Sequence, residues 1–508
     1  MINGKNKRVN YIDPIVANSI IRGNIYDRNS KLLAIEVPYY SCSFRVDKID
    51  NLEEVALQCA PFLDMDSSTI INKAQEYTYQ ALIKSRISDD KVEPFMQFVK
   101  DNKLTNLVKI EKKYGRDYPY SFHSAQTIGF VGYDNNGLEG IEHTLNDILY
   151  PGPQLNESIT YGEDVYLTLD MNIQYLCDLE VQRVNEEFSP ESAIAIVMDA
   201  KNGEILALSS YPWYDLNNFG ESTIESRKNN TISMLYEPGS VFKIFSFAAL
   251  LELNEADFDT PFYCDGSYEF ELNGQSFTIN CSHEHGLVTK DTMLKYSCNG
   301  AISKWALETD SEAFYNKLIE FGFDSKKDLP LNGIARSRIQ EPELWSLRSK
   351  PTIAFGQELL TTAINLTSAA TAISNKGYLV EPKLIKQIGE KETPPATSTQ
   401  IISESTAQTV LDDMVKTTQE GGTAIKAKVD GVNVAAKTGT AQLLNEETKS
   451  YEDGQSLAST IAIVDATDPK YIIYFAAKAP SKNSIWGSNV ASPAVKNIIE
   501  GLKAQNKL

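Results

Sequence analysis

Residues 236–251 read YEPGSVFKIFSFAALL. Pro238 and Gly239 end an incoming loop, and the residues that follow are apolar nearly all round a predicted helix, which must therefore be buried. Ser240 and Lys243 are three residues apart, so they lie on one face of that helix. Burial and the positive end of the helix dipole both disfavour a charged lysine there. The pattern predicts a neutral amine beside a serine hydroxyl, which is a general base beside a nucleophile.

Two further motifs follow this Ser-x-x-Lys in chain order. By itself the first motif is weak evidence, because the same spacing recurs at 88–91 among polar residues, and a lysine near a helix end often extends its amine to solvent. Residues 297–299 read Ser-Cys-Asn after a predicted helix over 290–295, and residues 437–440 read Lys-Thr-Gly-Thr on a predicted strand. Gly439 lets a substrate backbone approach closely. Each motif alone is common in proteins, whereas the three motifs in this order are far more specific evidence.

Length and composition bound the remaining possibilities. The chain has 508 residues, 42% of them hydrophobic, and a formal net charge of −20 at pH 7. About two to four domains are expected at this length, and wholesale disorder is excluded. The acidic balance disfavours nucleic acid as a partner. No apolar run is long enough to span a bilayer and the first residues do not form a signal peptide, which is compatible both with a soluble protein and with a chain cut just after a membrane anchor.

The pattern along the chain changes at 151–153, Pro-Gly-Pro, which we take as a domain boundary. The first region, 1–155, is predicted to be a mixed domain. Its expected elements are a strand within 21–34, a helix over 51–60 that ends at Pro61, and a helix over 67–84.

The second region, 156–508, is predicted to form a sheet covered by helices. It begins with an apolar hairpin over 193–210 and continues through helices from 240 and at 363–373. Its last expected strands lie at 433–440, 459–464 and 471–476, and 390–399 is expected to be an exposed loop. This order predicts an α+β fold in which helix clusters flank an antiparallel sheet.

Cysteine and histidine residues leave two questions open. Cys264 and Cys281 flank a predicted hairpin with Asn273-Gly274 as its turn, so a disulfide and two free thiols are equally compatible with the sequence. Cys281, His283 and His285 alternate as on one side of a strand, and with Cys264 they make a candidate zinc set. No Gly-x-Ser-x-Gly surrounds a serine, which disfavours a Ser-His-Asp hydrolase.

The ordered triple resembles the penicilloyl-serine transferases. The first region resembles the non-catalytic pedestal of class B penicillin-binding proteins, on the stretches RGNIYDR at 22–28, RDYP at 116–119 and GLEGIE at 137–142. GGTA at 421–424 also fits. Within class B, 237–240 and 137–142 look more like the division-type (septal) branch.

Three positions depart from the pattern of that family. Ser30 stands where the family usually has glycine, Cys298 lies in the middle of Ser-x-Asn, and Ala436 replaces a common glycine. None of these departures removes a reacting group.

The resemblance implies a dimerisation-type pedestal over 1–155 and a β-lactamase-like transpeptidase domain over 156–508. It implies a septal peptidoglycan D,D-transpeptidase that binds D-Ala-D-Ala stem peptides and is inhibited covalently by β-lactams. By analogy, the protein would be held by a single-pass anchor at the extracytoplasmic face of the bacterial cytoplasmic membrane. Its partners there would be a SEDS-type glycosyltransferase and division proteins.

The resemblance also implies a role for each motif residue. Ser240 would attack the peptide, Lys243 would take its proton, Ser297 would relay a proton to the leaving amine, Asn299 would orient the donor peptide, and Lys437 would polarise the relay.

The third motif would bind the substrate. Thr438, Gly439 and Thr440 would hold it, and the backbone N–H groups of Ser240 and Thr440 would form the oxyanion hole. This serine mechanism needs no cofactor and no metal, so the cysteine and histidine cluster is interpreted as loop chemistry, with zinc as the alternative.

Five alternative functions remain to be weighed. An elongation-type class B transpeptidase or a D,D-carboxypeptidase would share the motifs. A serine β-lactamase would have no evident use for a pedestal, and a penicillin sensor needs signalling or spanning segments. A non-catalytic division scaffold would need none of the five reacting residues.

Overall fold

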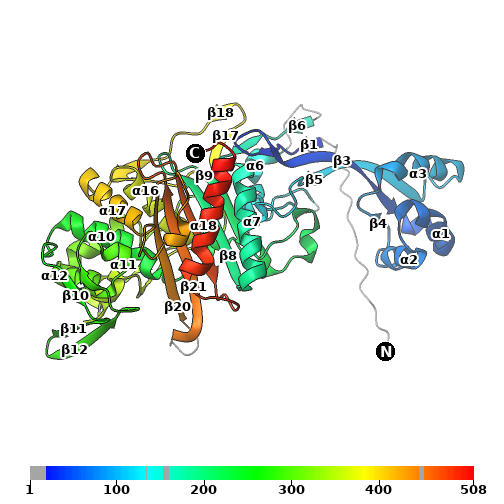
Figure 1. Cartoon of the computed structure of the whole chain (residues 1–508). Helices are drawn as coiled ribbons and strands as arrows, with labels where there is room; N and C mark the ends of the chain where they lie inside the picture. Colours follow the sequence, from blue (N-terminus) through cyan, green and yellow to red (C-terminus); the bar gives the residue numbers. More distant parts are fainter. Residues whose placement is uncertain (1–18, 133, 153–158, 445–450) are drawn as a thin grey trace.

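The computed structural model describes residues 19–132, 134–152, 159–444 and 451–508. The molecule is elongated, and a small group of helices at one end is joined by two long strands to a larger body (Figure 1). The small group holds α1 (Leu52–Leu63), α2 (Ser67–Gln75) and α3 (Asp89–Asp101), and the two strands are β3 (Leu32–Phe44) and β5 (Val108–Asp117).

A five-stranded antiparallel sheet forms the centre of the larger body. Its strand order is β20-β21-β22-β8-β9, with bounds Val434–Leu444, Tyr451–Val464, Tyr471–Lys478, Ser192–Asp199 and Ile205–Tyr211. The hairpin and the three late strands predicted from the sequence are thereby confirmed. β20, which carries the Lys-Thr-Gly-Thr motif, is an edge strand of this sheet.

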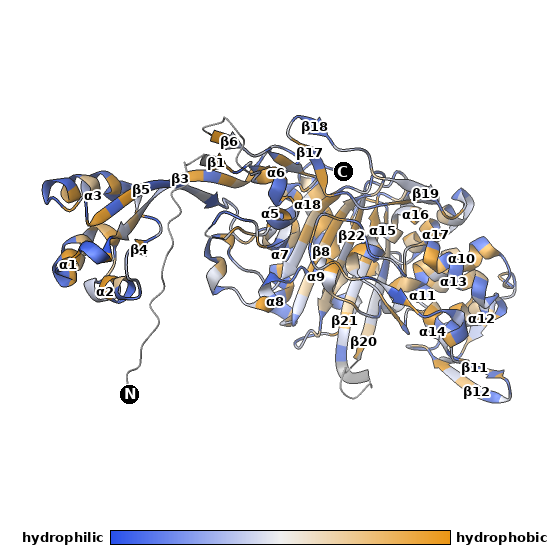
Figure 2. Ribbon diagram, turned by 180° about the vertical axis from the view of Figure 1, so that it is seen from behind, coloured by the Kyte–Doolittle hydropathy of each residue, from blue (hydrophilic) through white to orange (hydrophobic). Residues whose placement is uncertain are grey.

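The two faces of this sheet pack against different helices. Along β8 the side chains alternate between two buried clusters: Ala195 and Val197 pack toward α7 (Met171–Phe188) and α18 (Gly487–Ala504), whereas Ile194 and Ile196 pack toward the helix cluster on the opposite face. The central strands are accordingly apolar along nearly their whole length (Figure 2). A sheet covered on both faces requires this pattern.

The helix cluster on the second face is built from segments far apart in the chain. Its members are α10 (Lys243–Leu253), α11 (Met293–Tyr296), α12 (Asn299–Glu308), α13 (Ser311–Glu320), α14 (Ser349–Ala354), α15 (Ala363–Ala369), α16 (Thr371–Ser374) and α17 (Glu404–Lys416). Nearby lie α8 (Ile224–Arg227), α9 (Asn230–Ser233) and the short strands β14 (Arg338–Ile339), β15 (Leu359–Leu360), β16 (Tyr378–Val380) and β19 (Ser398–Gln400).

A mixed sheet joins the two regions of the chain. Its order is β18-β17-β7-β2-β3-β4, with β5 also paired to β3. β2 (Ile25–Tyr26) and β4 (Ala81–Lys84) come from the first region, whereas β7 (Val165–Leu167), β17 (Ile385–Ile388) and β18 (Lys391–Glu392) come from the second. The predicted boundary, between residues 155 and 156, lies outside the described residues, and the mixed sheet takes strands from both sides of it.

A buried ion cluster holds the three pedestal motifs together. Arg22 Nε lies 2.6 Å from Glu142 Oε2, and Arg116 Nε lies 2.5 Å from Glu142 Oε1. All three side chains are buried. One residue from each motif therefore meets the others at a single point, next to α4 (Ala125–Ile128), α5 (Gly140–Thr144) and α6 (Asn146–Leu149).

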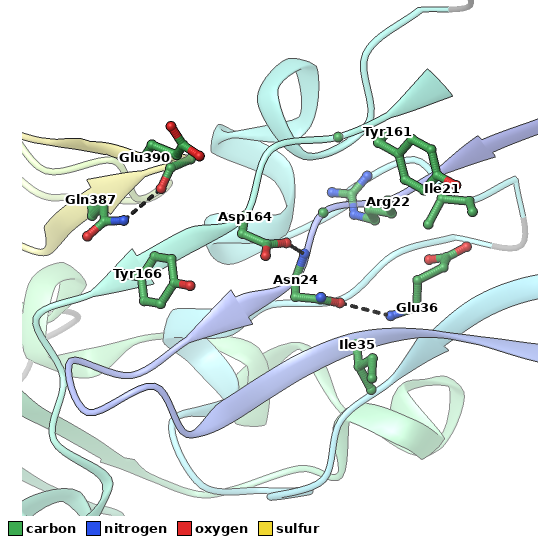
Figure 3. Close-up of a pocket in the computed structure, with 13 residues that line it drawn as sticks. Ile21, Arg22, Asn24, Ile35, Glu36, Tyr161, Asp164, Tyr166, Gln387 and Glu390 are labelled. Carbon is green, nitrogen blue, oxygen red and sulfur yellow. Dashed lines mark hydrogen bonds between the residues drawn. The ribbon is translucent and has the colours of Figure 1, made fainter. Parts of the chain in front are cut away.

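A pocket of about 620 Å³ lies beside the mixed sheet and takes lining residues from β3, β7 and β17 (Figure 3). Arg22, Asn24, Asp164, Tyr166 and Gln387 are among its lining residues. β1 (Ser19–Ile21) and β6 (Ile159–Tyr161) pair beside it. The pocket contains none of the three motifs of the second region.

Two predictions in the first region are wrong. The helix expected over 67–84 ends at Gln75, because residues 81–84 form β4 and pair with β3, with Ala81 and Ile83 turned into the core. Pro61 lies inside α1, which continues to Leu63. A proline this close to the helix end removes only one hydrogen bond.

Two smaller features of the sequence have clear structural counterparts. Ser30, one of the three departures from the pattern of the family that the chain resembles, adopts a left-handed backbone with φ 64°, a conformation to which glycine is suited. Residues 390–399 are mostly exposed loop, as expected, with short strands at either end.

No helix among the described residues is both long enough and apolar enough to cross a membrane.

Candidate active site

Ser240 lies on a short 3₁₀ turn, Gly239–Phe242, that runs directly into α10. Gly239 has φ 55° and donates its N–H to the backbone oxygen of Gly356 (2.9 Å). A Cβ on Gly356 would lie 2.1 Å from the carbonyl oxygen of Gly239. Glycine is therefore needed at both positions where these backbones meet. This close packing fixes the turn that carries Ser240.

Lys243 is fully buried, and its amine contacts the hydroxyls of both Ser240 and Ser297. Nζ lies 3.0 Å from Ser240 Oγ, 3.1 Å from Ser297 Oγ, 2.6 Å from the Ser297 carbonyl oxygen and 2.6 Å from Asn299 Oδ1. The last two atoms only accept hydrogen bonds, whereas a hydroxyl can also donate. A neutral amine has two N–H groups for these two acceptors and one lone pair for a hydroxyl. The geometry therefore suits a lysine that accepts a proton.

The loop between α11 and α12 presents Ser297 and Asn299. Ser297 has a left-handed backbone with φ 58°, which turns the chain sharply before α12 begins at Asn299. Asn299 Nδ2 donates to the backbone oxygen of Asn280 (2.8 Å) while its Oδ1 accepts from Lys243. The amide is thus held at both ends.

Lys437, on edge strand β20, contacts the hydroxyl of Ser297 as well. Its Nζ lies 2.9 Å from Ser297 Oγ and 2.9 Å from the Thr438 carbonyl oxygen. The structure thus brings together, from three separate segments of the chain, the five predicted reacting residues Ser240, Lys243, Ser297, Asn299 and Lys437.

Burial lowers the pKa of both lysines. Desolvation lowers the pKa of Lys243 to about 8. Desolvation, and after it the nearby charge of Lys243, lower the pKa of Lys437 well below its usual range. A buried amine avoids the cost of carrying charge by releasing its proton. Above about pH 8 most of the Lys243 amine is therefore neutral and can act as a base.

Gly439 allows β20 to lie directly against the turn that carries Ser240. A Cβ at this position would lie 2.6 Å from Ser459 Oγ, 2.9 Å from Val241 Cγ2 and 3.2 Å from the Pro238 carbonyl oxygen. The backbone around the nucleophile and that of the third motif are therefore in contact. This proximity is what an oxyanion hole built from the N–H groups of Ser240 and Thr440 requires.

The remaining two residues of the third motif differ in exposure. Thr438 is buried, and Thr440 is partly exposed with its Oγ1 accepting a hydrogen bond from the N–H of Gly487 (3.0 Å). Gly487 opens α18, and sequence reasoning did not select it. Asn280 was missed in the same way, because a backbone carbonyl group leaves no signal in the residue type.

Residues 193–500, more than half of the chain, match a family described as "Penicillin binding protein transpeptidase domain". The chain belongs to this family. Residues 18–151 of this penicillin-binding protein match the "Penicillin-binding Protein dimerisation domain". The resemblance to class B penicillin-binding proteins, with a pedestal before a transpeptidase domain, is thereby confirmed.

Relatives match this penicillin-binding protein over nearly its full length. It is 29% identical to "Probable peptidoglycan D,D-transpeptidase PenA" of Neisseria gonorrhoeae, over 94% of this chain and 84% of that protein. It is 28% identical to "Stage V sporulation protein D" of Bacillus subtilis, over 94% of this chain and 77% of that protein. Penicillin binding protein 3 from Mycobacterium tuberculosis, solved with aztreonam, shares the fold with a TM-score of 0.76 at 24% identity, over 97% of each chain.

Proposed function

We propose that this penicillin-binding protein is a peptidoglycan D,D-transpeptidase that cross-links stem peptides through an acyl group on Ser240. One observation carries the proposal. The buried amine of Lys243 lies within hydrogen-bonding distance of the hydroxyls of both Ser240 and Ser297. A neutral base between a nucleophile and a relay hydroxyl is what acyl transfer by serine needs.

Acylation begins when Ser240 Oγ attacks the carbonyl carbon between the two terminal D-alanines. Lys243 Nζ takes the hydroxyl proton as the new C–O bond forms. The N–H groups of Ser240 and Thr440 stabilise the negative charge that develops on the carbonyl oxygen, and losing one such donor typically costs about 3–4 kcal/mol. A proton then passes through Ser297 to the leaving nitrogen, the C–N bond breaks, and D-alanine leaves.

The second half of the reaction reverses these roles. An amine from another stem peptide attacks the acyl carbon, Lys243 accepts its proton, and Ser240 leaves with a proton restored to its oxygen. Lys437 donates to Ser297 Oγ and keeps the relay oriented. Asn299 orients the donor peptide, and Thr438, Gly439 and Thr440 on edge strand β20 hold it and its terminal carboxylate. An exposed strand edge is a natural platform for an extended peptide.

Intact-protein mass spectrometry with excess benzylpenicillin tests the nucleophile. We expect one covalent adduct that persists for hours on the native protein, because a transpeptidase hydrolyses the acyl-enzyme slowly. Ser240→Ala should form no adduct, whereas Ser88→Ala, which alters the exposed Ser-x-x-Lys at 88–91, should be acylated like the native protein. An adduct of equal yield on Ser240→Ala would refute the assignment.

A second assay separates transpeptidase from carboxypeptidase chemistry. A pentapeptide donor is mixed with a D-amino acid as the acceptor amine, and the products are resolved by mass. Incorporation of the amine supports the proposal. Release of D-alanine with hydrolysis alone would favour the carboxypeptidase, and rapid consumption of benzylpenicillin would favour a β-lactamase.

We also propose that the enzyme acts in septal synthesis at the extracytoplasmic face of the cytoplasmic membrane, as its motifs at 237–240 and 137–142 suggest. In this proposal a single-pass anchor holds the protein there. The pedestal, taken as residues 1–155, contacts a SEDS-type glycosyltransferase and division proteins, and the transpeptidase domain spans 156–508.

Depletion of the protein in its native host tests the cellular role. Filamentous cells with blocked septa would support a septal function, whereas rounded cells would support the elongation-type alternative. Co-purification of a SEDS-type protein with the full-length native protein, lost when the pedestal is replaced, tests the proposed partner.

A further inference from the structure

A second cluster of chemically reactive side chains lies directly beside the catalytic loop. Cys264, Cys281, His285 and Cys298 place their ligand atoms within 4.8 Å of one another. Cys264 and Cys298 are fully buried, and the other two are partly buried. The proposed reaction uses none of these four side chains.

Backbone hydrogen bonds between separate segments position three of the four residues. Cys264 ends β10 (Phe262–Cys264), and its carbonyl oxygen accepts from the N–H of His285 (3.1 Å), just before β13 (Gly286–Val288). Cys281 follows the hairpin of β11 (Ser267–Leu272) and β12 (Gln275–Asn280), and its N–H donates to the carbonyl oxygen of Gly266 (2.9 Å). Cys298 is the N-cap of α12.

The distances fit a metal ion better than a covalent bond. Cys281 Sγ and Cys298 Sγ lie 3.8 Å apart, and Cys264 Sγ lies 3.2 Å from His285 Nδ1. A disulfide would need about 2.05 Å between sulfurs, and all six thiols are free. A tetrahedral zinc ion holds two sulfurs about 3.8 Å apart and a sulfur and a nitrogen about 3.5 Å apart.

We propose that Cys264, Cys281, His285 and Cys298 bind one structural Zn²⁺ ion. Three sulfurs and one imidazole nitrogen form a closed ligand set, which is typical of structural rather than catalytic zinc. Soft thiolate ligands also disfavour Mg²⁺ and Ca²⁺. The ion has no step in the acyl transfer.

The helix that follows the cluster supplies the outer hydrogen bonds that such a site needs. The N–H of Gly300 donates to Cys281 Sγ (3.4 Å), and the N–H of Ala301 donates to Cys298 Sγ (3.5 Å). Both groups belong to the first turn of α12, a ten-residue helix. N–H groups directed at sulfur stabilise the negative charge of a metal-bound thiolate.

The ligand set differs from the one that the sequence suggested. His283 is exposed and its ring is not part of the cluster, because residues 281–285 form an irregular loop rather than a strand. Cys298, from the catalytic motif, takes the fourth position. This residue is also the departure from the family pattern noted between Ser297 and Asn299.

The ion would position the catalytic loop. Cys298 lies between the two residues that contact Lys243, and Asn299 Nδ2 donates to Asn280, the residue before Cys281. Zinc bound to Cys281 and Cys298 would hold both sides of this hydrogen bond. This positioning role rests on the proposed function, whereas zinc binding itself does not.

Metal content is the first test, made on the whole protein incubated with Zn²⁺ under reducing conditions and then desalted. Native mass spectrometry should find one zinc per chain, and Co²⁺ in its place should give sulfur-to-metal charge-transfer bands. Cys281→Ser and His285→Ala should lose stoichiometric zinc. His283→Ala and Cys177→Ala, which change an adjacent histidine and a buried cysteine elsewhere, should keep it.

Two results would overturn the site. One is that the native protein binds less than one zinc per chain. A disulfide within the cluster, revealed by thiol alkylation, would count as this result. The other is zinc retained by both Cys281→Ser and His285→Ala.

Acylation by benzylpenicillin tests the positioning role separately. A competing chelator should slow acylation of the native protein at least tenfold, and added Zn²⁺ should restore the rate. An unchanged rate after verified zinc loss would refute positioning and leave the metal site intact. Failure of the zinc-loaded protein to acylate at all would instead count against the proposed function.

Discussion

At Lys243 the chemistry is decided by what surrounds a single amine. Two of its four neighbours, the Ser297 carbonyl oxygen and Asn299 Oδ1, can only accept hydrogen bonds, so a neutral amine satisfies them and keeps a lone pair for a hydroxyl. Desolvation lowers the pKa of this lysine to about 8. The residue type is visible in the sequence, but this environment depends on groups more than fifty positions away.

The acylation rate should depend on pH through Lys243. Below about pH 8 the amine is protonated and cannot take the proton of Ser240, so the second-order rate constant with benzylpenicillin should rise with pH. It should be half-maximal near the pKa and level off above it. Stopped-flow or quenched mass spectrometry over about pH 6–10 measures this.

Lys327 provides the matched control for this profile. It is a second buried lysine whose pKa is lowered by desolvation, but it pairs with Glu381 outside the site. Lys327→Met should leave the midpoint of the profile unchanged. A native rate that is flat or falls as pH rises would contradict a neutral-lysine base.

At the scale of elements, the site depends on backbone contact between β20 and the turn before α10. Gly439 permits this contact, since its missing side chain leaves room for Val241 and Ser459. The sequence predicted β20, the late strands and the apolar hairpin, because alternation and turn residues are local signals. It failed for residues 81–84, whose strand conformation depends on pairing with β3.

Gly439→Ala should separate the two elements and disturb the oxyanion hole. We expect acylation by benzylpenicillin to fall about 100-fold or more, with the free energy of unfolding lowered by about 1–3 kcal/mol because the new methyl group overpacks the contact. Kinetics and denaturant unfolding measure the two effects. Gly220→Ala is the control, since a Cβ there meets nothing within 4 Å. Native-like acylation by Gly439→Ala would show that the contact tolerates a side chain.

At the scale of the whole molecule, one carboxylate joins the three pedestal motifs. Glu142 is fully buried between Arg22 and Arg116. Each motif could be recognised separately by its residues, but their meeting point appears only when β5 and α5 pack beside the segment before β2. The mixed sheet extends this connection to β7 and β17 of the second region.

Glu142→Gln should destabilise the fold without changing the chemistry. Removing the charge leaves two buried arginines without their partner, which typically costs about 3–5 kcal/mol. Denaturant unfolding should detect this loss, while acylation of the protein that remains folded stays within about twofold of the native rate. Glu139→Gln, which weakens the partly exposed pair with Arg227 at 3.7 Å, should cost less than about 1 kcal/mol. Equal effects of the two variants would contradict the central role of Glu142.

Residue types and their order along the chain were sufficient to identify the family and the sheet strands and to select five candidate site residues that the fold brings together, because motifs and periodicity are properties of local sequence. Distances between segments were not accessible in this way. The alternation of Cys281, His283 and His285 suggested one strand face, but those residues lie on an irregular loop, and Cys298 takes the place of His283 in the cluster. Only packing of β10, the hairpin and α12 brings these sulfurs together, since hydrogen bonds between distant backbones set where each loop ends.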